Sequence, residues 1–559
     1  MTDQFTVTRR TALAGLSVAA GAGAMPAFGK ADDAARKMFR HGIASGDPDA
    51  TSVVLWTRIS GLDSATVDWE IASDPGFARP VRSGQFATGP ERDFTVKVLA
   101  EGLQPGARYY YRFRANGVTS PVGRTRTLPV GRVGRLGIAL ASCSNFAFGY
   151  FNAYDAIAKD AAVDFVLHTG DYIYEYGADG WGSDRARKLG RVHQPANEIV
   201  SLSDYRTRHA QYKTDAGAQA MHAAKPLLAC WDDHESANNP WLGGAQNHQA
   251  ETEGDWAMRR SASIQAYFEW MPVREPGPGR TRAQFWRTYV FGDLATLTTL
   301  ETRHTARALQ VDYEPYRKSI ASFADAARME REAIGAPGRA MLAPELEADL
   351  TAAWNHSRQT GQPWRLIGNP MPIARTRVPD VVSLGLIPDP ATQAKPLPAA
   401  VDLAWKGKWN LPFYPDTWDG YEWARERLYA QAQAAGVNDL VFLTGDSHSF
   451  WANRLADAAG KPMGVELGTA GITSPGDFVE SGFDLATAAR LDQAFAEHNP
   501  EVVWTDNLHQ GYVRLVLTPS AGHASFIAVN TVATPAYRTR AIGEWNLRKA
   551  AGELVLAKL

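Results

Sequence analysis

The sequence predicts an α+β protein, in which a small all-β domain precedes a larger domain built from strands and helices. Residues 39–128 carry short runs of β-branched and aromatic residues between turn signals. After Arg135, runs typical of buried strands recur and are separated by helical stretches. The 559 residues, 45% hydrophobic and 21% charged, suffice for more than one packed core, and they exclude a disordered chain, a collagen-like fibre and a small disulfide scaffold.

The first 29 residues are expected to be an export signal. Arg9 and Arg10 precede a weakly hydrophobic, alanine- and glycine-rich run that continues to about Phe28, and Ala27 and Gly29 suit a cleavage site. This order is typical of twin-arginine signals, and a mobile tail or a short core helix is the alternative. We therefore expect the twin-arginine export machinery as a partner and a periplasmic or secreted protein. No later stretch reaches ~18 apolar residues, so no transmembrane segment is expected in the mature protein.

Residues 30–130 form the predicted β domain, an immunoglobulin-like or fibronectin-like sandwich. Strands are expected at 52–56, 66–71 and 109–113, and turn signals such as Asn116-Gly117 separate them. The segment 103–106 leads to Tyr109 in the manner of a tyrosine corner. Because the domain carries no constellation of ligands or nucleophiles, we expect it to be structural or to form a wall beside an active site.

The charge and the cysteine content argue against a nucleic-acid-binding protein and against a disulfide-stabilised scaffold. Lysine and arginine number 58 against 60 aspartate and glutamate, a formal charge of −2, which gives no sign of a stable nucleic-acid partner. Any affinity for phosphate must come from a local site. The two cysteines, Cys143 and Cys230, are too few for a disulfide framework, and Cys230 lies inside a strand run and is expected in the core.

Polar side chains follow four runs that are typical of buried strands, at 136–141, 163–169, 226–231 and 440–444. Helices are expected around 154–159 and 421–435, and a weaker strand at 364–367 ends at Asn369. Because ligands of open α/β sheets lie beyond the carboxyl ends of the strands, the endings are expected at one rim. Each ending alone has an ordinary explanation as a turn, a solvated helix start or a buried thiol, whereas the ordered set favours a metal site. The candidate ligands are Cys143, Asp171, Tyr174, Asp233, Asn238, Asp446 and His448.

The residue types suit a two-metal hydrolytic centre, which needs a carboxylate that bridges two ions. Asp171 is the natural bridge, and Tyr174 and the thiolate Cys143 add donors that favour iron or zinc over calcium. An oxygen-rich side suits a divalent ion such as calcium. His234 follows Asp233 directly, so it could reach the substrate as general acid or transition-state donor.

Four motifs occur in a fixed order along the chain: Ser142-Cys143-Ser144, Gly170-Asp171-Tyr172-Ile173-Tyr174, Trp231-Asp232-Asp233-His234-Glu235 and Gly445-Asp446-Ser447-His448. Further matches lie at 45–48, 53–58, 204–208 and 418–421. Together they resemble the alkaline phosphatase D family of the calcineurin-like metallophosphoesterase superfamily. The resemblance implies a catalytic domain over 131–559, with two β-sheets packed as a sandwich and flanked by helices.

The resemblance also implies cofactors and an activity. It places Cys143, Asp171, Tyr174 and His448 on Fe³⁺, Asp171, Asp233 and Asp446 around Ca²⁺, and Asn238 near a second Ca²⁺. The expected reaction is in-line hydrolysis of phosphate monoesters and diesters, in which a hydroxide held by the metals attacks phosphorus. The family's usual Leu-Asp-Thr-Arg is Leu300-Glu301-Thr302-Arg303 here, and Asn369 replaces an expected Gln.

The expected catalytic residues are His234, Asp171 and Arg191, the last as a bidentate phosphate clamp. A solvated helix face is the alternative for Arg191 and its neighbours His193, Arg206 and Arg208. Expected substrates are small phosphate esters, with nucleotides, phospholipids and teichoic acid-like diesters as candidates. A phosphodiesterase or phospholipase D with the same metals, and a non-catalytic surface module, are the alternative functions.

Overall fold

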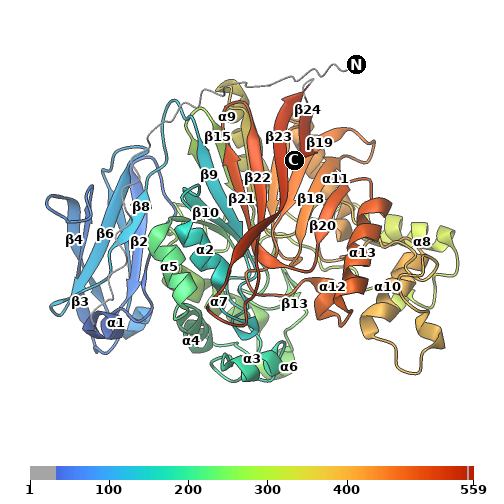
Figure 1. The fold of residues 1–559 in the computed structure, drawn as a ribbon, viewed down its shortest axis with the longest axis horizontal. Helices are drawn as coiled ribbons and strands as arrows, with labels where there is room; N and C mark the ends of the chain where they lie inside the picture. Colours follow the sequence, from blue (N-terminus) through green and yellow to red (C-terminus); the bar gives the residue numbers. More distant parts are fainter. Residues whose placement is uncertain (1–32, 551–552) are drawn as a thin grey trace, which may run out of the picture.

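The computed structural model describes residues 33–550 and 553–559. The predicted export signal at 1–29 lies outside the described residues. Two large sheets pack face to face at the centre of the molecule, and helices lie on their outer faces (Figure 1). The expected α+β sandwich flanked by helices is therefore confirmed.

The first large sheet has ten strands, and its centre is parallel. Strands β9, β10 and β11 run parallel in register, with Leu167 opposite both Leu140 and Leu228. In sheet order, the strands are β24 (Glu553–Lys558), β23 (Thr539–Ala550), β22 (Gly522–Val529), β21 (Gln510–Leu517), β9 (Leu136–Ala141), β10 (Phe165–Thr169), β11 (Leu227–Cys230), β1 (Ile43–Gly46), β2 (Ser52–Arg58) and β5 (Thr95–Glu101).

The second large sheet has seven strands, of which β15, β16, β17 and β19 are parallel neighbours. In sheet order, the strands are β14 (Thr288–Phe291), β15 (Ala295–Thr299), β16 (Trp364–Asn369), β17 (Leu440–Thr444), β19 (Pro462–Gly468), β18 (Phe450–Ala456) and β20 (Val502–Asp506). The strands expected at 364–367 and 440–444 are confirmed as β16 and β17.

The main core lies between the two sheets, where Leu140 and Leu167 of the first sheet meet Leu366 and Val441 of the second. Continuous apolar runs form these strands because both faces of each strand are buried, one by the other sheet and one by helices. The first sheet is covered by α2 (Asn152–Lys159), α4 (Leu202–Tyr212), α5 (Ala216–Ala224) and α7 (Trp256–Trp270), and the second by α9 (Pro344–Gln359) and α11 (Glu422–Ala434).

The remaining elements lie at the ends and edges of these layers. They are α1 (Asp33–Met38), α3 (Ser183–Leu189), α6 (Ala250–Glu253), α8 (Phe323–Met329), α10 (Pro398–Lys408), α12 (Asp477–Glu480) and α13 (Leu485–His498), and the two-stranded ribbon of β12 (Pro240–Trp241) and β13 (Gly244–Ala245). Within the described ranges, no helix combines the length and apolar character required to cross a bilayer.

The N-terminal part is a sandwich of two sheets, at the blue end of Figure 1. One sheet contains β4 (Pro80–Thr88), β3 (Ala65–Ala72), β6 (Arg108–Ala115), β7 (Val118–Thr119) and β8 (Gly123–Arg126), and the facing layer is β1, β2 and β5. Val53 and Val96 of that layer pack against Val67 and Phe113. The backbone N–H of Gln104 donates to the Tyr109 hydroxyl at 2.8 Å, which confirms the expected tyrosine corner.

Strand β1 joins this small sandwich to the large sheet. Gly46 pairs in parallel with Leu227 of β11, and the backbone N–H of Asp47 donates to Leu227 O at 2.8 Å. A side chain at Gly46 would place its Cβ 2.5 Å from Pro272 O and 2.9 Å from Leu227 O, so only glycine permits this approach. The β domain is thus fixed against the strand that leads into Asp233.

Candidate active site

The polar endings of β9, β10, β11 and β17 converge on one buried cluster. The first three belong to the ten-stranded sheet and β17 to the seven-stranded sheet, so the site lies where two facing sheets end, and the expectation of a single rim was incomplete. The side chains form three groups whose ligand atoms lie within 4.8 Å of one another: Cys143, Asp171 and His448; Asp171, Asp233 and His234; and Asp171, Asp232, Asp233 and Asp446. Asp171 belongs to all three.

One side of the cluster combines sulfur, phenol and imidazole donors. The Cys143 thiol donates to Asp171 Oδ2 at 3.4 Å, and the Tyr174 hydroxyl donates to the same oxygen at 3.2 Å. The Tyr174 hydroxyl also lies 3.3 Å from His448 Nε2 and 2.9 Å from Ser474 Oγ. The four side chains assigned to iron from the sequence therefore converge around one carboxylate oxygen. We name Cys143, Asp171, Tyr174 and His448 the mixed-donor side.

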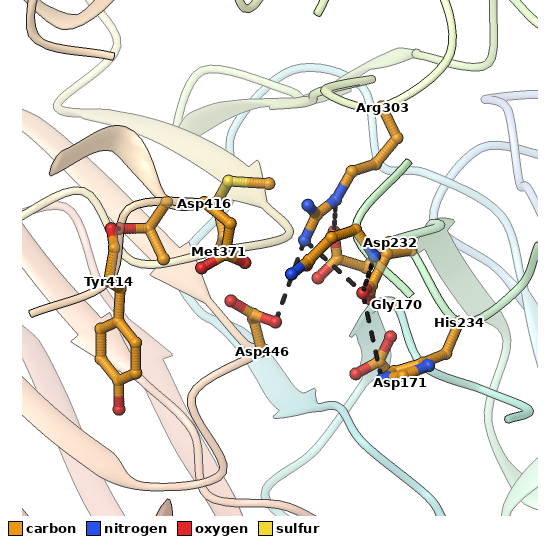
Figure 2. A network of polar contacts seen from close by, with 12 residues as sticks. Gly170, Asp171, Asp232, His234, Arg303, Met371, Tyr414, Asp416 and Asp446 are labelled. Carbon is orange, nitrogen blue, oxygen red and sulfur yellow. Dashed lines mark hydrogen bonds and ion pairs between the residues drawn. The ribbon is translucent and has the colours of Figure 1, made fainter. Parts of the chain in front are cut away.

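The other side is rich in carboxylates and contains one arginine (Figure 2). Arg303 Nε donates to Asp232 Oδ1 at 2.5 Å, and its Nη2 lies 3.9 Å from both Asp233 Oδ1 and Asp446 Oδ1. Asp232 and Arg303 are completely buried, whereas the Asp446 side chain is 20% exposed. We name Asp232, Asp233, Asp446 and Arg303 the carboxylate side.

A buried glutamate fastens the loops that carry these ligands. Glu235 accepts hydrogen bonds from the backbone N–H groups of Asp171, Tyr172 and Asp232, at 3.1, 2.6 and 2.8 Å. Gly170 permits this contact, because with its φ of 102° an added Cβ would lie 2.4 Å from Asp232 N and Cβ. The loops after β10 and β11 are therefore fixed relative to each other.

Four candidate ligands have a left-handed backbone, which is uncommon for residues other than glycine. The φ angles are 59° at Cys143, 55° at Asp171, 66° at Asp446 and 52° at His448. Such conformations cost roughly 1–3 kcal/mol each and cluster at functional sites. The tight turns after β9, β10 and β17 thus aim their side chains at a common point.

Crowding of acidic groups shifts the pKa values in the cluster. Burial and the charge of Asp233 raise the pKa of Asp171 well above its ordinary value, and burial and Asp232 do the same for Asp446. Burial, aided by the Asp171 charge, raises the pKa values of the Cys143 thiol and the Tyr174 phenol. Burial lowers the pKa of His448 to about 3, which leaves a neutral imidazole with ligand capacity.

His234 is held by Glu175, a residue that the sequence analysis gave no role. His234 Nδ1 lies 2.7 Å from Glu175 Oε2, and Nε2 lies 4.0 Å from Asp233 Oδ2. Burial opposes a charge on the imidazole, but the carboxylates of Asp233 and Glu175 outweigh it and raise the pKa of His234 well above its ordinary value. The structure thus holds the His234 imidazole at the cluster, and its role as general acid stays a prediction.

Arg191 is the principal correction to the predicted site. Its guanidinium donates to Phe146 O and to Asp215 Oδ2, both at 2.9 Å, and stacks on the Phe146 ring with 3.6 Å to the centroid. Asp215 also caps the N-terminus of α5 by accepting from Gly217 N at 2.8 Å. Arg191 is thus committed to packing of the loop, and its guanidinium is not the phosphate clamp.

The amide nitrogen and the backbone N–H of Asn238 are both engaged in hydrogen bonds. Its Nδ2 donates to Gln246 Oε1 at 3.1 Å, and its backbone N–H donates to Glu175 at 2.8 Å. It is the next residue, Asn239, whose backbone N–H donates to Asp233 Oδ2 at 2.9 Å. These bonds leave the Asn238 amide oxygen available, so calcium ligation by Asn238 stays a prediction.

Arg303 has no role in the expected site, yet the structure places its guanidinium at the carboxylate side. It follows β15, and its loop is ordered by Glu301, which accepts from the backbone N–H groups of Arg303 and His304 at 2.8 and 2.7 Å and from Trp231 Nε1 at 3.2 Å. The signal was present in the Glu-Thr-Arg sequence directly after a strand. The other departure, Asn369, is buried and binds Trp418 Nε1 at 3.2 Å and Met371 O at 2.6 Å.

The carboxylate side fits metal cations. Asp171 Oδ1, Asp232 Oδ2 and Asp233 Oδ1 are buried and accept no hydrogen bond from any described residue. Unpartnered buried oxygens are costly, and the four carboxylates outnumber the Arg303 guanidinium and the His234 imidazole that face them. Cations satisfy both the oxygens and the charge, so the residues present fit a centre with more than one metal ion.

Comparisons with known proteins identify the family of this chain. The model of the PhoD-like phosphatase family matches residues 138–526, and that of the PhoD-like phosphatase N-terminal domain matches residues 23–129. The chain is 33% identical over 545 residues to alkaline phosphatase D of Bacillus subtilis (strain 168), covering 94% of this chain and 84% of that protein. A solved structure of PhoD matches with a TM-score of 0.73 and 29% identity, covering 93% of this chain and 92% of that one. The chain therefore belongs to the PhoD-like phosphatase family and is a phosphoric ester hydrolase.

Proposed function

We propose that the protein is an exported alkaline phosphatase that hydrolyses phosphate monoesters and diesters at a multinuclear centre of iron and calcium. The observation that carries the proposal is the position of Asp171, which is common to all three groups of possible metal ligands. A two-metal hydrolase needs such a shared carboxylate between ions ~3.5–4 Å apart.

The donor chemistry supports a different metal on each side. Cys143, Tyr174 and His448 offer sulfur, phenol oxygen and nitrogen, a set that suits Fe³⁺. Asp233 and Asp446 offer only oxygen, which suits Ca²⁺. When bound, such ions would supply a nucleophile derived from water at neutral pH and would neutralise charge on phosphate oxygens.

The chain's own residues orient the substrate and move a proton. Glu175 fixes the His234 ring through Nδ1, so Nε2 is directed to the cluster at 4.0 Å from Asp233 Oδ2. The Tyr174 ring packs beside the imidazole with 4.2 Å between centroids and limits its rotation. His234 Nε2 is therefore placed to donate its proton to the leaving oxygen of the ester.

Export through the twin-arginine pathway is supported by the N-terminal sequence, in which Arg9 and Arg10 precede an apolar run. Folding before export would let the Cys143 thiolate acquire its metal in the reducing cytoplasm. Replacement of both arginines by lysine should retain the precursor in the cytoplasm, as measured by cell fractionation and by the mass of the mature protein. Unchanged export would contradict this route.

The metals and the substrate class are tested on the purified protein. Elemental analysis should find iron and calcium, and the protein should absorb visible light through a Tyr174 phenolate on iron. Cys143→Ala should lose iron in preference to calcium. Cys230→Ala is the matched control, because Cys230 is equally buried but lies inside β11 with its thiol directed to backbone oxygens.

Initial rates on p-nitrophenyl phosphate, bis(p-nitrophenyl) phosphate and phosphatidylcholine separate the candidate activities. Hydrolysis of both the monoester and the diester supports the proposal. Activity on the diester or the lipid alone would favour the phosphodiesterase or phospholipase D alternative. A fully active, colourless protein without iron would overturn the proposed metal assignment.

A further inference from the structure

Arg303 lies deep in the carboxylate side, away from the solvent-exposed edge of the site. Its side chain is 0% exposed, whereas that of Asp446, the nearest carboxylate toward solvent, is 20% exposed. Figure 2 shows its guanidinium extending into the space between Asp232 and Asp446, while His234 approaches the cluster from another side. An oxygen atom that enters past Asp446 would therefore meet Arg303 on one side and His234 on the other.

The position of the guanidinium is fixed in advance. Nε is held by Asp232 Oδ1 at 2.5 Å, and the Arg303 backbone N–H is held by Glu301 Oε1 at 2.8 Å. Glu301 further accepts from the backbone N–H groups of His304 and Thr305, at 2.7 and 3.0 Å. The side chain thus loses little freedom on binding a ligand, which is the condition for a strong bidentate contact.

The terminal nitrogens of Arg303 have no acceptor among the described residues. Nη1 and Nη2 are buried and donate to no atom of the described chain. Nη2 lies 3.9 Å from both Asp233 Oδ1 and Asp446 Oδ1, which is too long for a hydrogen bond. A buried donor without a partner is costly, so the geometry calls for a further oxygen atom beside Nη1 and Nη2.

We propose that Arg303 binds the non-bridging oxygens of the substrate's phosphoryl group and is the phosphate clamp that Arg191 does not provide. The planar fork of a guanidinium matches two phosphate oxygens, and this is the arginine whose fork faces the proposed metal ligands. The inference deepens the proposed function and rests on cations at the carboxylates of Asp171, Asp233 and Asp446. With cations at those carboxylates, Asp232 holds Arg303 through Nε, and Nη1 and Nη2 are left as donors for phosphate oxygens.

The clamp should also favour monoesters. Arg303 and the metal ions bind the same non-bridging oxygens of the substrate. A monoester has three such oxygens and a diester has two, so a monoester can contact the metals and still offer oxygens to Arg303. Loss of the guanidinium should consequently reduce turnover of the monoester more than that of the diester.

Arg303→Lys separates a clamp from a simple counter-ion, because lysine retains the positive charge and loses the fork. We expect the competitive inhibition constant for inorganic phosphate to rise about 10- to 100-fold, with iron and calcium contents unchanged. The ratio of monoester to diester kcat/KM should fall. Arg303→Gln should change the inhibition constant and the substrate ratio in the same directions, by a larger factor, because glutamine has neither the charge nor the fork.

Arg425→Lys is the matched control, since Arg425 is also buried and pairs with Asp419 at 2.8 Å outside the cluster. It should leave phosphate inhibition and the substrate ratio unchanged. Wild-type phosphate affinity in Arg303→Lys, or a loss of metal that accounts for the whole effect, would overturn the clamp.

Circular dichroism and thermal unfolding verify that each variant is folded. If Arg303→Lys does not fold, the clamp is tested on wild-type protein by infrared difference spectroscopy with ¹⁵N-labelled arginine. A guanidinium band that shifts when phosphate binds supports the clamp, and unshifted guanidinium bands overturn it. Wild-type protein without iron or calcium would contradict the proposed metals while leaving the phosphate comparison intact.

Discussion

Two sets of buried carboxylates in this molecule have opposite environments. Asp171, Asp232 and Asp233 each keep a buried oxygen without a hydrogen-bond donor among the described residues. Glu235 and Glu466 are equally buried, but each accepts at least three hydrogen bonds, and Glu466 binds Ile373 N and Ala374 N at 3.0 Å and Thr444 Oγ1 at 2.8 Å. The first set is suited to cations. Glu235 fastens the loops that present this set, and Glu466 fastens the segment after β16.

The comparison predicts that the two sets respond differently to removal of charge. An amide in place of a ligand carboxylate should impair metal binding and activity while leaving the fold intact. An amide in place of a loop-fastening glutamate should first lower stability and only then activity, because its hydrogen-bonded backbone groups lose their acceptor. Four experiments test this distinction.

Asp171→Asn should have the largest effect. We expect kcat/KM to fall at least about 10³-fold and both metals to be depleted, because this carboxylate is shared by both sides of the cluster. The metal-free variant should be at least as stable as metal-free wild type at neutral pH. Burial and neighbouring charges raise the pKa of Asp171, so its ionised form destabilises the fold above the ordinary pKa. A marked loss of stability would place Asp171 in the second set.

Removal of metal from the wild-type protein should have the second-largest effect. Dialysis against a chelator should abolish turnover reversibly and lower the free energy of unfolding by about 4 kcal/mol, the value for ions present at ~1,000 times their dissociation constants. The missing partners of Asp171 Oδ1 and Asp233 Oδ1 are the structural reason. Calorimetry before and after readdition of iron and calcium measures this loss of stability. An unchanged Tm would contradict a role for these oxygens in cation binding.

Glu235→Gln should destabilise the protein by about 2–4 kcal/mol in the presence and absence of metals alike. Its carboxylate accepts from three backbone N–H groups, and one amide oxygen cannot serve all of them. Chemical unfolding gives the free energy, and Glu269→Gln is a control at a glutamate that pairs with Arg206 outside the cluster. If the Glu235→Gln variant keeps full stability but loses metal, Glu235 positions the metal ligands without stabilising the fold.

All four residues of the mixed-donor side were predicted from the sequence, whereas only Asp233 and Asp446 of the carboxylate side were. Buried strand runs ended at Cys143, Asp171 and His448, and close approach of strand ends follows from the parallel arrangement. Strand β15 was overlooked because Ala295–Thr299 is rich in threonine, whose hydroxyls find partners such as Thr288 across the sheet, 3.0 Å from Thr298. Without that strand end, Arg303 had no place in the expected site.

Arg191 was misassigned for a related reason. A polar stretch does not reveal which of its charges will find a partner elsewhere in the fold. The partner of Arg191 is the helix-capping Asp215, 24 residues further along the chain, and pairing of this kind depends on tertiary packing. Local pattern therefore identifies strand-end ligands better than it identifies a substrate-binding arginine.

Glu301→Asp should have the smallest effect, because it restores the residue that is usual in the family that the chain resembles. The shorter side chain can still accept from the backbone N–H groups of Arg303 and His304, but its reach to Trp231 Nε1, already 3.2 Å away, is reduced. We expect a loss of about 1 kcal/mol in stability and a rise of about two- to fivefold in the inhibition constant for phosphate, with metal content unchanged. Thermal unfolding and inhibition kinetics on one preparation measure both. A larger effect on metal content than on phosphate would move Glu301 from fastening the Arg303 loop to supporting the metal ligands.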